Sequence, residues 1–243
     1  AYTGLIYLYK KRRRELAAFL ALALVAVEAA VNTTVTSVTT TSREAYTRDN
    51  KEVQALMEKL EPAEDFYRVE KKTRKTKNDG AWMNFPSVSL FSSTANADLT
   101  KFFKRMGCEA STNAYSITGS TPLVDSLLSV RYALYSEYIP NTDLVNYIQE
   151  SGGTYLYENL YTLPLGFVLP YDLADNWQYQ MENPAEVQNV LCLLLGTDDV
   201  LVPVETEVSG SGCPFTADMA GEYYVYIQNK KVKNVKASLP SGE

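Results

Sequence analysis

The chain has 243 residues, enough for one large domain or two small ones, and its 46% hydrophobic and 21% charged residues are ordinary for a globular protein. It contains no histidine, which excludes a Ser-His-Asp triad, a Cys-His dyad and a histidine-ligated metal site within this chain. The formal net charge is −6, and the excess of cations is confined to the first 80 residues, so we expect no broad surface for nucleic acid.

The three cysteines, Cys108, Cys192 and Cys213, are an odd number and have no CxxC spacing. This pattern predicts neither a disulfide framework nor a zinc site, although one pair could form in an oxidising compartment. We therefore expect no metal and no cofactor.

Five consecutive cations at residues 10–14 run into an apolar stretch from Leu16 to Val38. As a helix this stretch is about 34 Å long, enough to cross a hydrocarbon core of about 30 Å. A cleaved signal peptide and a buried helix of a soluble protein are the two alternatives. The flanks favour a membrane span, because residues 1–9 are themselves apolar and aromatic and resemble the end of a preceding helix.

The positive-inside rule then predicts the topology of this region. We expect residues 1–9 to end a preceding span, residues 10–15 to form a basic cytoplasmic loop, and residues 16–38 to be a transmembrane helix. Everything after Val38 would lie outside the cell. Glu28 would be an intramembrane polar residue and hence a candidate functional site. The alternative for Glu28 is a carboxylate near the outer interface that is hydrogen-bonded to a neighbouring helix.

Downstream, the apolar spacing, turn residues and helix caps predict alternating helices and short strands. Helices are expected at 44–60, 98–107, 121–128 and 183–195, with Asn96 or Asp98 as a cap, Gly107 as a stop and Pro122 in a first turn. Strands are expected at 66–71, 129–135, 155–158, 166–169, 200–208 and 222–228.

This succession predicts an α+β fold. A transmembrane helix would be followed by a mixed α/β extracytoplasmic domain over residues 44–195, and residues 196–243 would begin an antiparallel β domain. Because a β-sandwich needs about seven strands, we expect this second domain to be partial and the chain to be part of a longer protein.

Six cations lie within ten residues, at Arg68, Lys71, Lys72, Arg74, Lys75 and Lys77. Such a segment would attract lipid headgroups, an anionic polymer or a pyrophosphate carrier, and arginine suits phosphate oxygens. The alternative is a solvated edge strand whose charges prevent pairing between sheets.

Small polar residues mark the surrounding loops. Those that could line a sugar site are Asn78, Asp79, Ser93, Asn96, Ser120 and Asp125, with stacking faces from Trp82, Tyr115 and Tyr132. The same residues are equally typical of turns and helix caps. A glycosidase-like acid pair would require two of these carboxylates at a set separation, and the sequence favours structural roles for Asp79 and Asp125 instead.

Several motifs in order give a resemblance to a known family: FYRVEK, NDG, FSSTAN, DLTKFFKRMG, GSTPLVDSLLSVRYALY, YENLYTLPLGF and NPAEVQN. Together with a final span carrying Glu28 and Asn32, they resemble the bacterial membrane protein YfhO family over most of residues 16–195. The resemblance implies a polytopic membrane protein related to GT-C-type glycosyltransferases. Its sugar would come from a polyprenyl-phosphate carrier outside the membrane and go to a surface polymer such as lipoteichoic acid.

In such enzymes the general base is an acidic residue of an early extracytoplasmic loop, so the catalytic residues would lie N-terminal to this chain and remain unknown here. The implied partners are the carrier-linked sugar, an anionic surface polymer and membrane lipid, with no nucleic acid. A non-catalytic binding or scaffold module for a surface glycan or a partner protein is the alternative. A self-contained hydrolase is disfavoured, because no nucleophile motif is present.

Overall fold

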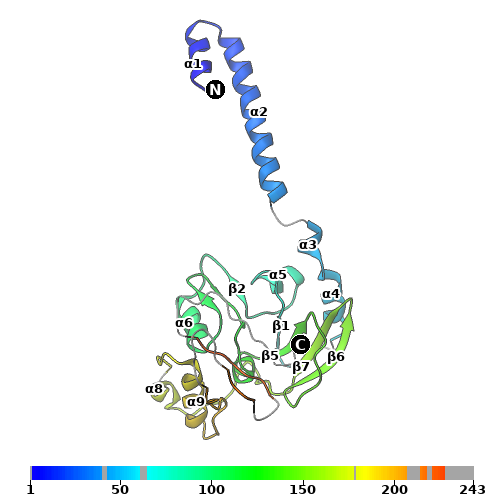
Figure 1. Ribbon diagram of the computed structural model, residues 1–243, viewed down its shortest axis with the longest axis vertical. Coiled ribbons are helices and arrows are strands. Elements are labelled where there is room, and N and C mark those ends of the chain that lie inside the picture. Colours follow the sequence, from blue (N-terminus) through cyan, green and yellow to red (C-terminus); the bar gives the residue numbers. More distant parts are fainter. Residues whose placement is uncertain are drawn as a thin grey trace. The chain divides into compact units, whose positions relative to one another are not determined.

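The computed structural model describes residues 2–39, 43–60, 65–177, 179–206, 214–217 and 221–227. The chain divides into two compact units, residues 1–48 and residues 49–243. Figure 1 labels the elements of both units. The mixed helix and strand content confirms the predicted fold class.

The first unit is helical. Helix α1 (Tyr2–Lys10) and helix α2 (Arg14–Thr39) lie side by side in an antiparallel hairpin, and helix α3 (Arg43–Thr47) follows (Figure 1). Arg12 reverses the chain with a φ of 63°. The cations of the hairpin loop pack on tyrosine rings, with Lys11 Nζ 4.8 Å from the ring centre of Tyr7.

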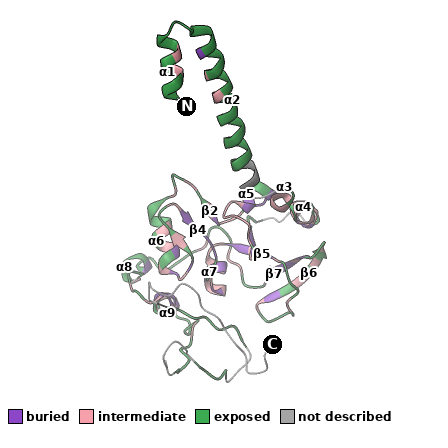
Figure 2. Ribbon diagram, turned by 45° about the horizontal axis from the view of Figure 1, so that its top comes forward, coloured by how far each residue is buried: buried purple, intermediate pink, exposed green. Residues whose placement is uncertain are grey.

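Helix α2 has 26 residues, which makes it about 39 Å long. Within it, residues Arg14–Thr36 are long and apolar enough to cross a membrane. Their side chains are almost all exposed, as the green colour along α2 in Figure 2 shows. An exposed apolar surface of this length is unfavourable in water and favourable in lipid.

The second unit is built on a four-stranded sheet of order β1-β5-β7-β6. Strand β1 (Arg68–Lys71) pairs in parallel with β5 (Val130–Tyr135), while β7 (Thr154–Asn159) pairs antiparallel with both β5 and β6 (Val145–Ser151). Gly152 and Gly153, both with positive φ, form the tight turn between β6 and β7.

The main core lies against this sheet. Helix α4 (Asn50–Glu58) inserts Val53 and Leu56, which are fully buried together with Val69, Leu134 and Leu156 of the strands. Helix α5 (Asp79–Met83) adds Met83 to the same cluster. Figure 2 shows buried residues on β5 and β7.

A second core joins a small antiparallel sheet to three helices. The sheet has the order β2-β4-β3, with β2 (Leu90–Phe91), β3 (Ala110–Ser111) and β4 (Ala114–Tyr115). Helices α6 (Ala97–Arg105), α7 (Pro122–Leu127) and α9 (Pro184–Leu194) contribute Phe103, Val124 and Val187 to its apolar cluster. The short helix α8 (Leu173–Asn176) precedes α9.

The helix caps were predictable from local sequence. The side chain of Asn96 accepts from the backbone N–H groups of Asp98 and Leu99 at the start of α6, as predicted. Thr121 caps α7 and Asn183 caps α9, each followed by proline in the first turn. Gly107 ends the turn after α6 with a φ of 86°.

Three sequence predictions need correction. Residues 43–58 form two short helices and not one, because Asp49 adopts a left-handed φ of 66° between them. Residues 166–169 are irregular, and no strand of the described part of the chain pairs with them. The described parts of the last two predicted strands, 200–206 and 222–227, are also irregular, and Pro203 removes a donor from the first. Residues 207–208 and 228 lie outside the described residues.

Candidate functional site

The cations of residues 68–77 are held by partners from distant parts of the chain. The ion pairs are Lys71 with Asp49 at 3.4 Å, Lys72 with Asp125 at 2.9 Å, Arg74 with Glu109 at 3.2 Å, Lys75 with Asp49 at 3.6 Å, and Lys77 with Glu109. Arg68 donates to the carbonyl of Leu128 at 2.7 Å and stacks over Phe66. These contacts hold the basic segment against other parts of the second unit.

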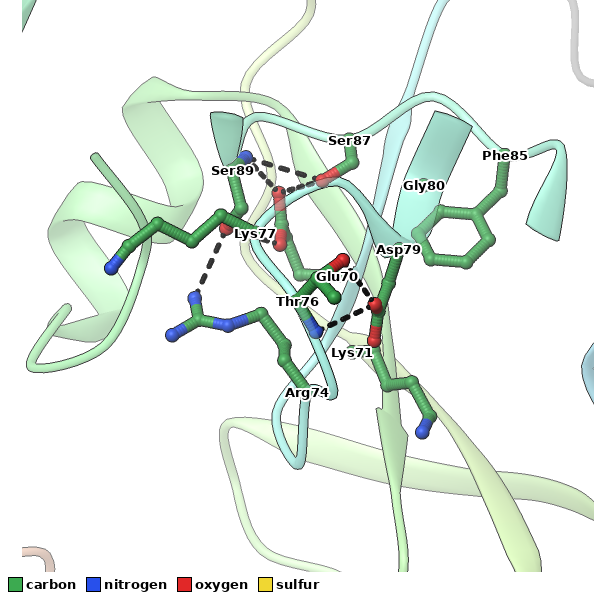
Figure 3. Close-up of a pocket in the computed structure, with 10 residues that line it drawn as sticks. All are labelled: Glu70, Lys71, Arg74, Thr76, Lys77, Asp79, Gly80, Phe85, Ser87 and Ser89. Atoms are coloured by element: carbon green, nitrogen blue, oxygen red, sulfur yellow. Dashed lines mark hydrogen bonds between the residues drawn. The ribbon is translucent and has the colours of Figure 1, made fainter. Parts of the chain in front are cut away.

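Part of this segment surrounds a buried carboxylate, Glu70, which has no exposed surface. Its oxygens accept from the hydroxyl of Ser87 at 2.8 Å, from the amide and the hydroxyl of Ser89, each at 2.9 Å, and from the amide of Val88. Figure 3 shows Glu70, Ser87 and Ser89 together with Arg74, which donates to the Ser89 hydroxyl at 3.2 Å. We call the residues around this carboxylate the Glu70 cluster. They are Glu70, Lys71, Arg74, Thr76, Lys77, Asp79, Gly80, Phe85, Ser87 and Ser89.

The Glu70 cluster is closely packed. The cavity volume between its side chains is about 0 Å³, so even a water-sized group has no room. Asp79 accepts from the amides of Lys75 and Thr76, each at 2.8 Å, and so fixes the turn that opens α5. Figure 3 shows the contact with Thr76. Asn78 exchanges two hydrogen bonds with the backbone of Phe91. These are turn and cap contacts of the kind that sequence analysis gave as the alternative to sugar binding.

Ser93 and Asn96 lie apart from this cluster. Both are exposed, and the Asn96 side chain is engaged as the cap of α6. The stacking candidates also separate: Trp82 is 47% exposed, whereas Tyr115 and Tyr132 are buried in the two different cores. The structure therefore distributes these predicted binding residues over several places.

A second polar site, the Asp125 cleft, does contain open space. Its cavity has a volume of about 60 Å³. The residues that line it are Lys72, Ser120, Pro122, Asp125, Tyr135, Leu144, Val145, Asn159, Tyr161, Glu222 and Tyr224. Three of the predicted site residues, Lys72, Ser120 and Asp125, are thus brought together here.

Local structure explains how these three residues meet. Lys72 follows β1, and its backbone N–H still donates to Leu134 of β5 at 2.8 Å. Asp125 lies in the first turn of α7, one turn after the capping residue Thr121. Thr121 donates to Gln188 of α9 at 2.5 Å, and Gln188 donates to the carbonyl of Met106 at 3.0 Å. This buried link fixes the start of α7 against α9.

Two polar atoms in the cleft have no hydrogen-bond partner among the residues that the structure describes. They are Oδ1 of Asp125, a residue with only 7% exposure, and the buried Oγ of Ser120. Asn50 Oδ1 and Ser129 Oγ share this property but do not line the cleft. A buried polar atom without a partner is costly, so the hydrogen-bond network beside this cleft is incomplete within the described residues.

The charged groups of the cleft shift one another's protonation. Burial opposes the charge of Lys72, but the adjacent Asp125 carboxylate outweighs this effect and raises the pKa of Lys72 above its ordinary value. Burial raises the pKa of Tyr135. Burial and the hydrogen bond from its hydroxyl to Glu222 also raise the pKa of Tyr224. At neutral pH the cleft therefore carries a Lys72 cation and neutral phenols.

The comparison with protein families covers almost the whole chain. The family model described as "Bacterial membrane protein YfhO" matches residues 1–238. The chain belongs to the YfhO family. Neither the curated proteins nor the solved structures that were searched contain a match.

Membership of the YfhO family, together with the candidate span in α2, makes this chain a bacterial membrane protein. Inside the first unit, the Tyr2 hydroxyl donates to Glu28 Oε2 at 2.6 Å. Glu28 is thus hydrogen-bonded to the neighbouring helix α1. Whether Glu28 has a function in the membrane stays a prediction.

Sequence reasoning missed five polar or aromatic groups that line the cleft in this YfhO-family chain: Tyr135, Asn159, Tyr161, Glu222 and Tyr224. They come from the ends of β5 and β7, from the loop after β7, and from residues 221–227. The only available signal was compositional, since eighteen tyrosines against eight phenylalanines indicate amphipathic surfaces.

The site residues can bind but do not form a recognisable catalytic pair. Carboxylate and hydroxyl oxygens are suited to hydroxyl ligands, and phenol rings are suited to the apolar face of a sugar. Among the described residues, no group of three or more acidic or cysteine side chains could hold a metal. Cys108 and Cys192 are both free and buried, and burial raises the pKa of the Cys108 thiol to about 12. Cys213 lies outside the described residues.

Proposed function

We propose that this chain is part of a membrane glycosyltransferase that moves a sugar from a polyprenyl-phosphate carrier to a cell-surface polymer such as lipoteichoic acid. In this proposal the second unit lies outside the cell and positions the acceptor polymer. The chemistry itself would be carried out by groups that the site described above does not contain.

The observation that carries the proposal is the Asp125 cleft. It combines an unpaired buried carboxylate oxygen, an unpaired hydroxyl and several tyrosines around open space. Sugar sites need such convergent hydrogen-bonding groups beside aromatic faces. Family membership and the candidate span support the membrane location, which is where a polyprenyl carrier resides.

Cells that carry variants of the cleft provide the functional test. We expect Asp125→Ala and Tyr161→Ala to lower the sugar content of the surface polymer, while the protein stays in the membrane at its normal level. Asp98→Ala removes a carboxylate that is 88% exposed and should leave the sugar content unchanged. Normal sugar content in both cleft variants would contradict the proposal and favour a non-catalytic scaffold.

The proposed location has its own test. In a background whose three cysteines are replaced by serine, we introduce Glu44→Cys after the span or Arg12→Cys before it. A membrane-impermeant thiol reagent applied to intact cells should label the first variant and not the second. Labelling of Arg12→Cys alone would place the second unit in the cytoplasm and refute this part of the proposal.

A further inference from the structure

We propose that residues 160–171, the apolar loop, rest on the surface of the lipid bilayer and place their side chains among the headgroups and the upper acyl chains. The loop follows β7 and precedes α8, and its sequence is LYTLPLGFVLPY. This inference concerns a contact with lipid and is independent of the proposed sugar transfer.

The composition of the apolar loop is that of a membrane interface. No Lys, Arg, Asp or Glu lies between Glu158 and Asp172. Tyr161 and Tyr171 stand near its two ends, and leucine, valine and phenylalanine dominate the middle. Tyrosine is enriched where a membrane meets water, because its ring is apolar and its hydroxyl is polar. The loop therefore combines side chains suited to acyl chains with side chains suited to headgroups.

These side chains are not used to pack the protein core. Val168 is 98% exposed, Leu165 is 58% exposed, and Tyr171 is fully exposed. A single exposed apolar residue is common on a protein surface, but a contiguous group of them marks an interaction surface. Apolar groups at this exposure are unfavourable in water and gain free energy on transfer to lipid.

The chain itself brings the apolar loop to a membrane. It belongs to a family of bacterial membrane proteins and carries a candidate span in α2. The second unit continues the same chain, so it meets lipid at a high local concentration. Lipid also requires no complementary shape from an irregular segment, whereas a protein partner does. Lipid, and not a second copy of the chain or another protein, is therefore the occupant of this surface.

The backbone limits how deeply the apolar loop inserts. Residues 160–171 form neither helix nor strand, so their N–H and C=O groups cannot enter the hydrocarbon core unpaired. Pro164 and Pro170 have no N–H, which lowers the number of such groups. The loop is also held near its ends: the N–H of Leu163 donates to a carbonyl of α7 at 3.3 Å, and the carbonyl of Pro170 accepts from the first residue of α8 at 3.1 Å. The loop therefore reaches the interface and not the centre of the bilayer.

Fluorescence quenching in phospholipid nanodiscs tests this inference. The full chain carries Cys213→Ser and Val168→Cys, while the buried Cys108 and Cys192 are kept. The new cysteine receives an environment-sensitive dye, and the chain without Val168→Cys measures the background labelling. The nanodiscs contain lipids with a nitroxide quencher either near the headgroup or deep in the acyl chain. We expect a blue-shifted emission and a larger loss of fluorescence with the shallow nitroxide than with the deep one.

Leu99→Cys is the matched control for the position of the dye. Leu99 lies on α6 and is 44% exposed, so it is also an apolar side chain at the surface. Its neighbours Asp98 and Lys101 have side chains that are 88% and 70% exposed, and such charged groups stay in water. A dye on this residue should emit as in water and keep its fluorescence with both nitroxides.

A second pair of variants tests the apolar contact itself. Leu165→Glu, added to the labelled Val168→Cys chain, should abolish most of the quenching, because a carboxylate is unfavourable among acyl chains. Leu165→Met keeps an apolar side chain of similar size and should leave the quenching unchanged. Both residues are exposed, so the variants should retain their fold, which circular dichroism checks.

Two outcomes overturn the inference. A blue-shifted emission that neither nitroxide quenches means that a protein surface covers the loop, and an emission equal to that of Leu99→Cys means that the loop stays in water. Stronger quenching by the deep nitroxide contradicts the assigned depth. Val168, Leu165 and Leu99 do not line the Asp125 cleft, so the quenching result and the sugar content of the surface polymer decide the two proposals separately.

Discussion

The Glu70 cluster and the Asp125 cleft are neighbouring polar regions with opposite organisation. The first contains more charged residues, yet the Glu70 carboxylate accepts four hydrogen bonds and the cavity volume is about 0 Å³. The second has fewer charges, a cavity of about 60 Å³ and two unpaired buried atoms. The difference teaches that charge density alone does not indicate a binding site. Unsatisfied polar atoms beside open space are the stronger indication.

Removal of Glu70 should have the largest effect on stability. Glu70→Ala deprives buried donors from Ser87, Val88 and Ser89 of their acceptor, and we expect the free energy of unfolding to fall by about 3–5 kcal/mol. Urea unfolding in micelles measures this change, with the exposed Glu58→Ala as a control that should stay within about 0.5 kcal/mol. A change of similar size in both variants would show that the cluster is not specifically stabilising.

Gly119→Ala should be the next most damaging change, and it acts beside the cleft. Gly119 has a φ of 84°, and a Cβ atom there would lie 2.6 Å from the carbonyl oxygen of Gly107. We expect a loss of about 2–4 kcal/mol from the combined backbone strain and clash. Gly153→Ala is the matched control, because its φ is 81° but nothing lies within 4 Å.

Gly153→Ala should therefore cost only about 1–2 kcal/mol, the strain of a left-handed alanine alone. Thermal unfolding of both variants gives the difference. If the two costs are equal, the close approach of Gly119 to Gly107 does not constrain the loop that carries Ser120.

Lys72→Met should have a smaller effect with a distinctive pH dependence. The ion pair with Asp125 is partly exposed, so its loss should cost about 1–3 kcal/mol at neutral pH. The pKa of Lys72 is raised in the folded state. The contribution of Lys72 to the free energy of unfolding is therefore complete below the ordinary lysine pKa of about 10.5, and it is lost as the pH rises through the folded-state pKa.

Stability curves measured from pH 8 to 11.5 test this sign. The difference in the free energy of unfolding between the unaltered chain and Lys72→Met should be constant near pH 8 and shrink toward pH 11.5. Lys101→Met, which removes a lysine whose side chain is 70% exposed, should show no such trend. A gap that widens with pH would contradict the assigned pairing.

Glu109→Gln should have the smallest effect. Hydrogen bonds from Lys77 and Ser116 hold the pKa of Glu109 below its ordinary value, but the side chain is 46% exposed, so we expect a loss of about 0.5–1 kcal/mol at pH 7. The contribution of Glu109 to the free energy of unfolding is present above the pKa of its unfolded state and is lost as the pH falls through the pKa of its folded state. Stability measured from pH 6 down to 3 should converge for the two proteins. Divergence toward low pH would exclude the assigned sign.

Local sequence predicted several helices and one central strand of the second unit. The caps of α6, α7 and α9 follow from single residues, Asn96, Thr121 and Asn183, and the buried strand β5 follows from its apolar run. Strand formation elsewhere depends on a partner. The polar β6 exists because β7 supplies its ladder, whereas the apolar residues 166–169 have no ladder and stay irregular.

The candidate site was predictable only in part, for the same reason. Lys72, Ser120 and Asp125 were recognisable as polar residues near turns, but their meeting depends on the pairing of β1 with β5 and on the packing of α7. Glu222 and Tyr224 join them from about 100 positions further along the chain. No periodicity within a local window can indicate a contact over that separation.

The burial of Cys108 has a consequence for its reactivity. Burial raises the pKa of this thiol to about 12, so the reactive thiolate is scarce at neutral pH. Oxidants and disulfide-exchange enzymes attack the thiolate, and the side chain is only 6% exposed. Folding therefore protects this cysteine from both reactions, whatever the redox state of its surroundings.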